Sequence, residues 1–426
     1  MRLSSKFLIF ISVINIGFAQ SNARYNLDEC IRIAVINNYD IQRTASALEI
    51  SKADVKNAYG NLYLPSVNFT ASGNRQLKES GINSFSMNAS ANYNIFEGFA
   101  SESNYSRAKN NLEYYEQQSK FREKQVSLDV FKGYTDIVKN MQIIKVREEN
   151  LKTGQKELER IDAQYKAGTS PVVDVYAQEA ELGSRELDLV TAENNLNISK
   201  SNLLNIMGRE PDTEVQFDET SLPSDITGET ISQFRAKFGS LDDAIKKALN
   251  TRIDYLAYNS DLQALNASID AAKSGYYPTV TASGGWSWAN SEFSGFGDRG
   301  APYLGLNLRV PIFENYRTDY QVESAMQQAN QRQIDKLQLE QSIRLSVKTQ
   351  FLSLAAAEKQ LEISARALKS AEKNFEAARE NYSVGTYNIT DFLNANYQVV
   401  NARINRINTV YNYYLVQREL LFIIGL

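Results

Sequence analysis

The chain contains an internal repeat. The stretch YKAGTSPVVDV, from Tyr165 to Val175, returns as YSVGTYNITDF, from Tyr382 to Phe392, at an offset of 217 residues. Shorter stretches return near the same offset: LDECIRIA matches LDDAIKKA, NIFEG matches PIFEN, and LLNIMG matches LLFIIG. Two similar halves are expected to fold into the same series of elements. We therefore predict a first structural repeat over residues 20–208, an acidic, proline-containing linker or equatorial segment over 209–240, and a second structural repeat over 241–426.

Each half predicts the same elements. An amphipathic helix comes first, over 27–60 and over 241–276, and glycine and proline end it. Two strands follow in each half, and a long helix and a shorter returning helix complete it. The predicted strands cover residues 66–75, 82–96, 279–289 and 303–313.

The second predicted strand alternates without a fault. The stretch FSMNASANYNIF, from Phe85 to Phe96, places apolar or small residues between uncharged polar ones. Because successive strand side chains point to opposite faces, one face is apolar and the other is covered by Ser and Asn. A soluble sandwich would bury the apolar face in a core, whereas a membrane barrel would turn it to lipid and line a lumen with the polar face. Taken by itself, this strand fits both a soluble sandwich and a membrane barrel.

Apolar residues step in sevens through each long helix, which is the pattern of a coiled coil. Each pattern runs for about 70 residues without proline, so each helix would be about 100 Å long. A Gly-Thr turn then reverses the chain, and a helix of about 37 residues returns along the long one. The heptad positions are Val130, Ile137, Ile144, Leu151, Leu158 and Tyr165 in the first repeat and Leu354, Leu361, Leu368, Phe375 and Tyr382 in the second.

Residues 1–19 are predicted to be a secretory signal peptide. Arg2 and Lys6 precede an apolar run that ends in a small-x-small cleavage site. The run is shorter than the roughly 20 residues that a membrane-spanning helix needs. No other stretch is apolar enough to cross a membrane as a helix, so membrane residence would depend on strands.

The composition removes several classes of function. The chain has no histidine, one cysteine and a net charge of −4. The usual zinc, Cys-His and Ser-His chemistries lack their residues, and the acidic balance disfavours nucleic acid. We expect no enzyme activity, no cofactor, no metal site and no nucleic-acid partner.

Four strands cannot close a membrane barrel. The smallest membrane barrels use about eight strands, and an open edge in lipid leaves backbone groups without hydrogen-bond partners. If the strands lie in a membrane, the chain must associate. A trimer would supply twelve strands and a dimer eight, and the Ser/Asn face would then line a water-filled pore.

The residues resemble a known family. The twofold order of elements, the LPSV and YPTV entries to the strands, the IFEG exit and the two tip motifs are similar to those of TolC-type outer-membrane efflux and secretion channels. The resemblance covers essentially the whole mature chain and implies an α+β membrane protein. It implies a homotrimer with one twelve-stranded outer-membrane β-barrel, four strands per chain, continuous with a long α-helical coiled-coil periplasmic barrel.

The same resemblance implies a location and partners. The protein would lie in the outer membrane of a Gram-negative-type bacterium, with outer-membrane lipid around the barrel and a tunnel through the periplasm. A periplasmic adaptor (membrane fusion) protein and an inner-membrane pump of RND, ABC or MFS type would complete a tripartite efflux pump or a type I secretion system. The cargo stays open between drugs, metal ions, siderophores and polypeptides, because the pump and adaptor select it.

The resemblance also implies a gate at the periplasmic tip. Tyr382 resembles a tyrosine that bonds to an aspartate on the neighbouring hairpin, and Asp174 resembles that aspartate. Tyr387 stands where the family latch has an arginine. Asp391 resembles an aspartate that constricts the pore, and Asn394 stands where a second aspartate is expected. The turns that adaptor helices would grip are Gly168, Thr169, Gly385 and Thr386.

A second function remains open at the level of the residues. The chain could be a secreted or surface coiled-coil fibre without channel activity, in which the strands form a small docking head. That hypothesis explains the heptads. It does not explain why strand pairs are duplicated with matched helical hairpins, or why aromatic residues recur near the strand ends.

Overall fold

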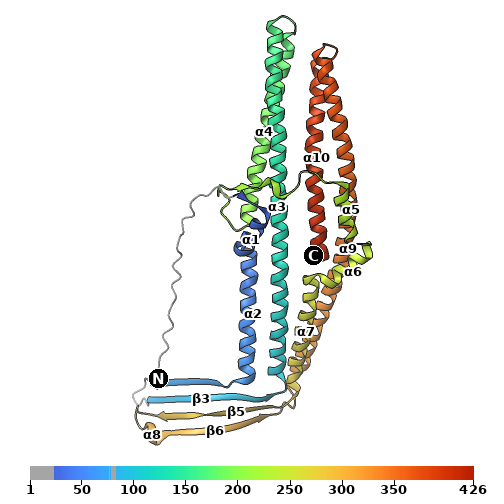
Figure 1. Cartoon of the computed structure of the whole chain (residues 1–426). Helices are drawn as coiled ribbons and strands as arrows, with labels where there is room; N and C mark the ends of the chain where they lie inside the picture. The colour runs from blue at the N-terminus through green and yellow to red at the C-terminus, as the bar shows by residue number, and fades with distance from the viewer. Residues whose placement is uncertain (1–23, 76, 78–82) are drawn as a thin grey trace.

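The computed structural model describes residues 24–75, 77 and 83–426, so the predicted signal peptide at 1–19 lies outside the described residues. Two helical hairpins stand side by side at one end, four strands lie at the other end, and shorter elements lie beside the long helices at mid-height (Figure 1). The main elements follow in the same order in the two halves of the chain.

The elements of the first half are α1 (Leu27–Asn37), α2 (Tyr39–Tyr63), β2 (Ser66–Arg75), β3 (Asn83–Glu97), α3 (Ala100–Lys166) and α4 (Val172–Ile206). Those of the second half are α6 (Leu241–Thr251), α7 (Ile253–Lys273), β5 (Thr279–Asn290), β6 (Gly300–Arg309), α9 (Arg317–Ser383) and α10 (Ile389–Ile424). Short elements η2 (Ser274–Tyr276) and α8 (Phe296–Arg299) flank β5.

The helices α3 and α9 run most of the height of the molecule, and each has 67 residues. Both pack against α7 on the strand side, and α4 and α10 return along them on the tip side (Figure 1). The heptad residues nearest the middle, such as Val130 and Leu361, are buried, whereas Tyr165 at the tip is 45% exposed. The predicted coiled-coil packing is therefore confirmed near the middle, and the heptad positions Leu158, Phe375 and Tyr382 toward the tips are partly buried.

None of the helices in the described part of the chain combines the length and the hydrophobicity of a membrane-crossing helix.

The first helix of each half is broken in two, so the single helices predicted over 27–60 and 241–276 are wrong. Asn38 lies between α1 and α2 with an extended backbone (φ −61°, ψ 130°). Its side chain accepts hydrogen bonds from the N–H groups of Asp40 (2.9 Å) and Ile41 (3.2 Å). This local cap replaces the continuous helical bonding. Arg252 takes a similar conformation between α6 and α7.

Each break receives the end of a returning helix. The Asn38 amide donates to the carbonyl oxygen of Ile206 in the last turn of α4 (2.8 Å). The Thr251 hydroxyl donates to the carbonyl oxygen of Ile424 at the end of α10. Gly208 follows α4 with φ +65°, and a Cβ atom there would lie 2.4 Å from a backbone oxygen of α1. These contacts fix the point at which each returning helix stops.

The four long strands form one antiparallel sheet in the order β2-β3-β5-β6. The pairs β2-β3 and β5-β6 are the two predicted hairpins, and β3 pairs with β5 to join the halves. Among the described residues β2 and β6 each have one strand neighbour, so each has an open edge.

The register places apolar side chains of all four strands on one face. Phe69 lies opposite Ala89, Ala89 opposite Trp286, and Trp286 opposite Pro302, and directly opposed residues share a face. The same apolar face holds Val67, Ala71, Phe85, Met87, Tyr93, Ala282, Trp288, Leu304, Leu306 and Leu308. The polar face holds Ser66, Asn68, Thr70, Ser72, Ser86, Asn88, Ser90, Asn92, Ser283, Ser287 and Asn307.

Two strand details differ from the prediction. The last strand, predicted over 303–313, lies at Gly300–Arg309. Pro311 has no N–H to give to a strand partner, which explains why the strand ends before it. In β3 the pairing jumps from Asn94 to Phe96, so Ile95 is the extra residue of a bulge and the alternation shifts there.

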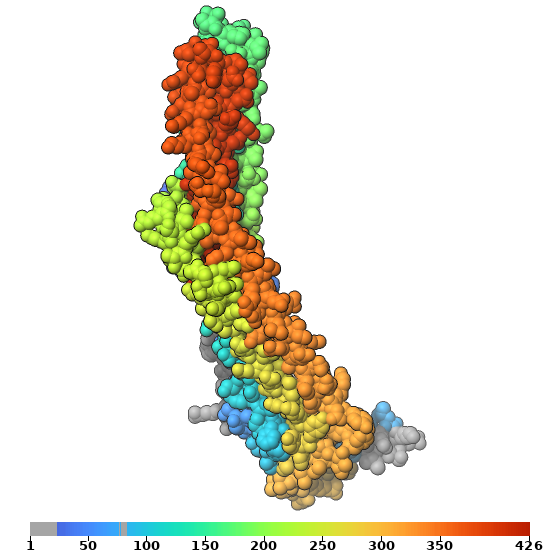
Figure 2. Space-filling model, turned by 90° about the vertical axis from the view of Figure 1, so that its right-hand side faces the viewer, coloured from blue at the N-terminus to red at the C-terminus, as the bar shows by residue number. Residues whose placement is uncertain are grey.

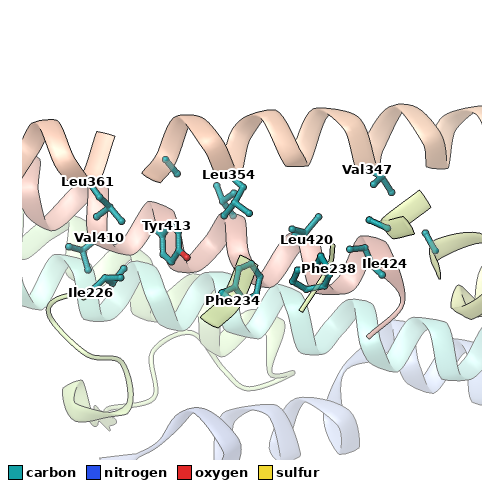
Figure 3. Packing of buried hydrophobic residues seen from close by; sticks show 14 of the residues in the cluster. Ile226, Phe234, Phe238, Val347, Leu354, Leu361, Val410, Tyr413, Leu420 and Ile424 are labelled. Carbon is teal, nitrogen blue, oxygen red and sulfur yellow. The ribbon is translucent and has the colours of Figure 1, made fainter. Parts of the chain in front are cut away.

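The linker 209–240 is folded against the helices. It contains β4 (Gln216–Phe217), which pairs in parallel with β1 (Arg24–Tyr25), the short helix η1 (Glu219–Ser221) and α5 (Gly228–Ala236). Phe234 and Phe238 are buried among residues of α9 and α10 (Figure 3), and Phe217 is buried with residues of α1 and α3. The linker therefore joins the cores of the two halves, and Figure 2 shows it as a bulge at mid-height.

Replacing Gly208 by alanine should destabilise the protein. The left-handed backbone and the close approach to α1 both exclude a Cβ atom, so Gly208→Ala should cost about 1–3 kcal/mol. Gly183→Ala is the matched control, because it lies inside α4 with no atom within 4 Å of the new Cβ and should stabilise the helix by up to about 1 kcal/mol. Guanidinium unfolding of the purified protein measures both. A Gly208→Ala variant as stable as the wild type would contradict this account of the helix end.

Candidate functional site

Both hairpin tips turn by the same local structure. The N–H groups of Gly168 and Thr169 bond back to carbonyl oxygens in the last turn of α3, each at 2.9 Å, and Gly385 and Thr386 make the same bonds to α9 at 3.2 and 2.9 Å. This is the Schellman motif, which requires a left-handed residue. The glycines have φ +76° and +79°. No atom lies within 4 Å of a Cβ built on either glycine, so the tips present open surface.

The helices that leave the two turns start differently. The Asn388 side chain caps α10 by accepting the N–H of Asp391 (2.9 Å). In the first repeat Pro171 occupies the cap position of α4, and the Ser170 hydroxyl donates to the Asp174 carboxylate (3.1 Å). An acidic side chain in the first turn is favoured by the partial positive charge of a helix N-terminus. The matched aspartates therefore have different surroundings.

One face of α10 leads from the tip toward the middle. Asp391 and Asn394 are exposed, while Phe392 and Ala395 beside them are buried. Residues three or four apart share a helix face, and this face continues with exposed, uncharged side chains. They are Gln398, Asn405, Asn408 and Asn412. The face therefore has one carboxylate at the tip and amides behind it, as the wall of a wet and weakly selective passage would.

Tyr382 lies between the two hairpins of one chain. Its ring stacks on Phe392 of α10 (centroids 5.2 Å apart, planes 12° apart), and the Arg160 guanidinium of α3 lies 5.1 Å from its centroid. Arg160 is paired with Glu157 one turn earlier (2.8 Å). A cation over an aromatic ring is attracted by the ring quadrupole. Tyr382 thus links the two tips through its ring.

Asp174 lies close enough to Tyr382 to act on it electrostatically. Burial, and then the negative charge of Asp174, raise the pKa of the Tyr382 hydroxyl, and Arg160 opposes the shift. Ile161, Val175 and Ile389 form a small buried cluster that also joins the tips. The structure therefore brings Tyr382 and Asp174 into one neighbourhood, while Tyr387 is exposed on the second tip.

Arg160 and Glu157 were missed by the sequence analysis. At the repeat offset their counterparts are Ala377 and Asn374. A charged pair that is present in one repeat and absent from the other was the available signal. The described residues contain no group of three or more acidic, cysteine or histidine side chains that could hold a metal ion.

A duct through a membrane explains these features together. One end of the chain offers an apolar sheet face with open edges, and the other offers long hairpins with an exposed, amide-rich face. The fold and the site define an outer-membrane channel protein. The sequence model of the family described as outer membrane efflux protein matches residues 30–209 and 244–426. The chain belongs to this family.

Relatives and solved structures agree with this assignment. The outer membrane protein TolC of Vibrio cholerae is 27% identical over 307 residues, which cover 70% of this chain and about two thirds (67%) of TolC. The crystal structure of CusC has a TM-score of 0.78 at 19% identity and covers 94% of this chain and 92% of CusC. VceC of Vibrio cholerae has a TM-score of 0.77 at 16% identity, with 94% and 96% covered. At such identities the solved structures show a shared fold.

The family assignment decides between the two functions that the sequence left open. The protein is an outer-membrane efflux channel, and the fibre hypothesis is not supported. The expected outer-membrane location is confirmed by the same family.

Proposed function

We propose that three copies of the chain close one twelve-stranded barrel in the outer membrane and form the exit duct of a tripartite efflux pump or a type I secretion system. The observation that carries this proposal is the open sheet: β2 and β6 each have an edge without a strand neighbour among the described residues. In lipid such an edge leaves backbone N–H and C=O groups without partners. Pairing β6 of one copy with β2 of the next removes every edge.

The number of strands favours a trimer over a dimer. Two copies would give an eight-stranded barrel, whose interior is filled by side chains or holds one small ligand. Three copies give twelve strands and leave room for passing solute. The apolar face, on which Leu304 is 89% exposed in one chain, would then contact lipid. The Ser/Asn/Thr face would line the lumen.

The helices extend the duct away from the membrane. A helix of 67 residues is about 100 Å long, enough for the tips to lie deep in the periplasm. The amide face of α10 would line the inner wall, so the channel itself discriminates little between solutes. We infer a passive conduit, with energy supplied by the pump through ATP or a proton gradient.

The tip would act as the gate. Three Asp391 carboxylates near a common axis would repel one another and attract cations, and Asn394 one turn further would form an uncharged ring. The contacts of Tyr382 with Arg160, and its proximity to Asp174, would hold the hairpins in the closed arrangement. Engagement of the pump complex would loosen these contacts and widen the aperture.

The tips also fit the docking of a periplasmic adaptor. The turns at Gly168, Thr169, Gly385 and Thr386 are exposed, and apolar side chains next to them, Val173 and Val384, are exposed as well. Exposed apolar residues in such a position are typical of an interaction surface. Helices of the adaptor would pack against these turns, and an inner-membrane pump of RND, ABC or MFS type would complete the path.

Breaking the tip contacts should raise the single-channel conductance. Asp174→Ala combined with Tyr382→Phe removes the carboxylate and the hydroxyl, and Arg160→Ala removes the cation above the ring. The partly exposed contact of Arg160 with the Tyr382 ring stabilises the closed tip by about 0.5–1 kcal/mol, so the open population should rise about two- to fivefold in Arg160→Ala. It should rise in the Asp174/Tyr382 variant as well. Planar-bilayer recordings of the protein extracted from membranes measure the change.

Arg379→Ala is the matched control, because it removes a positive charge from an exposed position of α9 near the same tip. It should leave the conductance unchanged. If the Asp174/Tyr382 and Arg160 variants conduct like the wild type, the tip residues do not form a latch.

Asp391 should determine the block of the channel by divalent cations. Asp391→Asn removes the ring of negative charge, so Mg²⁺ added on the tip side should block less. Asn394→Asp adds a second ring one turn away and should strengthen the block. Glu380→Gln, on exposed α9 surface near the turn, should change neither. Block that persists undiminished in Asp391→Asn would show that this residue does not line the pore.

A further inference from the structure

The loop between β5 and β6 folds back onto the sheet. It contains the sequence GFGDRG, Gly295 to Gly300, and lies at the end of the sheet away from the long helices (Figure 1). Gly295 has φ +72° and starts the single turn α8. The loop therefore has a defined structure, and its contacts show on which face of the sheet it rests.

Aromatic contacts place the loop on the apolar face. Phe296 stacks on Trp288 with ring centroids 4.5 Å apart. Phe293 packs edge-on against Trp288 (5.8 Å) and against Phe85 of β3 (5.9 Å). Trp288 lies opposite Met87 in the register, and Phe85 is two residues from Met87, so both belong to the apolar face.

Polar contacts and a close approach hold the loop in this position. The Trp288 indole N–H donates to the carbonyl oxygen of Gly295 (3.3 Å), and the Asn290 amide donates to the carbonyl oxygen of Ser294 (2.9 Å). A Cβ atom on Gly300 would lie 2.3 Å from the Trp286 ring and 2.5 Å from the Phe296 carbonyl oxygen. Only glycine allows the chain to pass the Trp286 ring here.

The loop covers one aromatic side chain, Trp288, and leaves two others, Phe293 and Phe296, exposed. Trp288 is 1% exposed beneath the loop, while Phe293 and Phe296 above it are 61% and 40% exposed. Exposing apolar area to water costs about 25 cal/mol per Å², so two phenylalanines directed outward from a short polar loop are unfavourable in water. Next to the boundary of a bilayer the same arrangement is favourable, because aromatic side chains collect there.

We propose that the β5–β6 loop is a membrane-interface anchor, which inserts Phe293 and Phe296 into the headgroup boundary of the outer leaflet on the outside of the barrel. The proposal rests on the proposed function, since it needs the apolar face to contact lipid. The partner is the lipid surface, because the rings of Phe293 and Phe296 continue the apolar face of the sheet. It follows that this loop leaves the mouth of the channel uncovered, because a lid would have to rest on the polar face.

Tryptophan fluorescence in lipid vesicles tests the anchor. The chain has two tryptophans, so Trp286→Phe with Trp288→Phe gives a background for single reporters. Phe293→Trp reports on the loop, Leu306→Trp on the middle of the apolar face, and Ser90→Trp on the polar face. Each full-length variant is reconstituted in phosphatidylethanolamine/phosphatidylglycerol vesicles with lipids brominated near the headgroup or deep in the acyl chain, and iodide serves as the aqueous quencher.

The expected result separates the three reporters. The reporter at 293 should lose more fluorescence to shallow than to deep bromines, the reporter at 306 should be quenched by deep bromines, and the reporter at 90 by iodide alone. A reporter at 293 that only iodide quenches, beside a lipid-quenched reporter at 306, would overturn the anchor and leave the barrel intact. Absence of lipid quenching at 306 would overturn the proposed function itself.

A second experiment tests the anchor if the Trp286→Phe, Trp288→Phe variant does not fold. In the otherwise native chain, p-benzoylphenylalanine in place of Phe293 keeps both tryptophans and an aromatic ring. After irradiation in the same vesicles, mass spectrometry should find lipid adducts at position 293. Their absence, with lipid adducts present when the same group replaces Leu306, would overturn the anchor.

Discussion

The open edges of the four-stranded sheet are the constraint on which the rest of the structure depends. In lipid, a single chain whose sheet has one apolar face and two open edges leaves backbone groups at those edges without hydrogen-bond partners. The proposed closure by copies of the same chain would solve this without any new element, because the interface would repeat around one axis. All four strands connect to α2, α3, α7 or α9 at the same end of the sheet (Figure 1), so these helices all leave the sheet from one end.

The middle of the molecule is where shorter helices end and others begin along the continuous helix α3. Below it α3 packs with α2 and α7, and above it with α4, so helices must end and begin along an unbroken partner. The breaks at Asn38 and Arg252 receive the ends of α4 and α10, and the folded linker covers the junction with buried aromatic residues. The equatorial region thus holds the two halves together in addition to the β3–β5 pairing and the packing of α3 against α7.

The large features of the fold could be predicted from the sequence, because they depend on periodicity. The heptads predicted the long helices, the alternation of apolar and polar residues predicted the strands, and the repeat predicted the order of the elements along the chain. The break at Asn38 was missed because one asparagine within an amphipathic pattern does not by itself distinguish a cap from an exposed helical residue. The fold of the linker was missed because its few apolar residues are buried against helices that lie far from them in the sequence.

In the candidate site, too, some features could be predicted from the sequence and others could not. The turns were predictable because Gly168 and Gly385 need a left-handed backbone, which a sequence pattern shows directly. Arg160 was not, because its contact with Tyr382 crosses between hairpins that are far apart in the chain. The two tips share the same turn, but Arg160 and Glu157 of the first tip have no charged counterparts in the second. We infer that the proposed gate depends on these side chains.

Disulfide trapping between edge strands tests the central claim most directly. Cys30 is the chain's one cysteine, and burial raises the pKa of its thiol to about 12. In a Cys30→Ala background, cysteines replace one of Val67, Phe69 or Ala71 on β2 and one of Leu304, Leu306 or Leu308 on β6. The account predicts that at least one pair gives a covalent trimer on a denaturing gel, whereas Asn68 paired with Leu306, on opposite faces, does not. Monomers or covalent dimers from every same-face pair would contradict closure of the sheet by three chains.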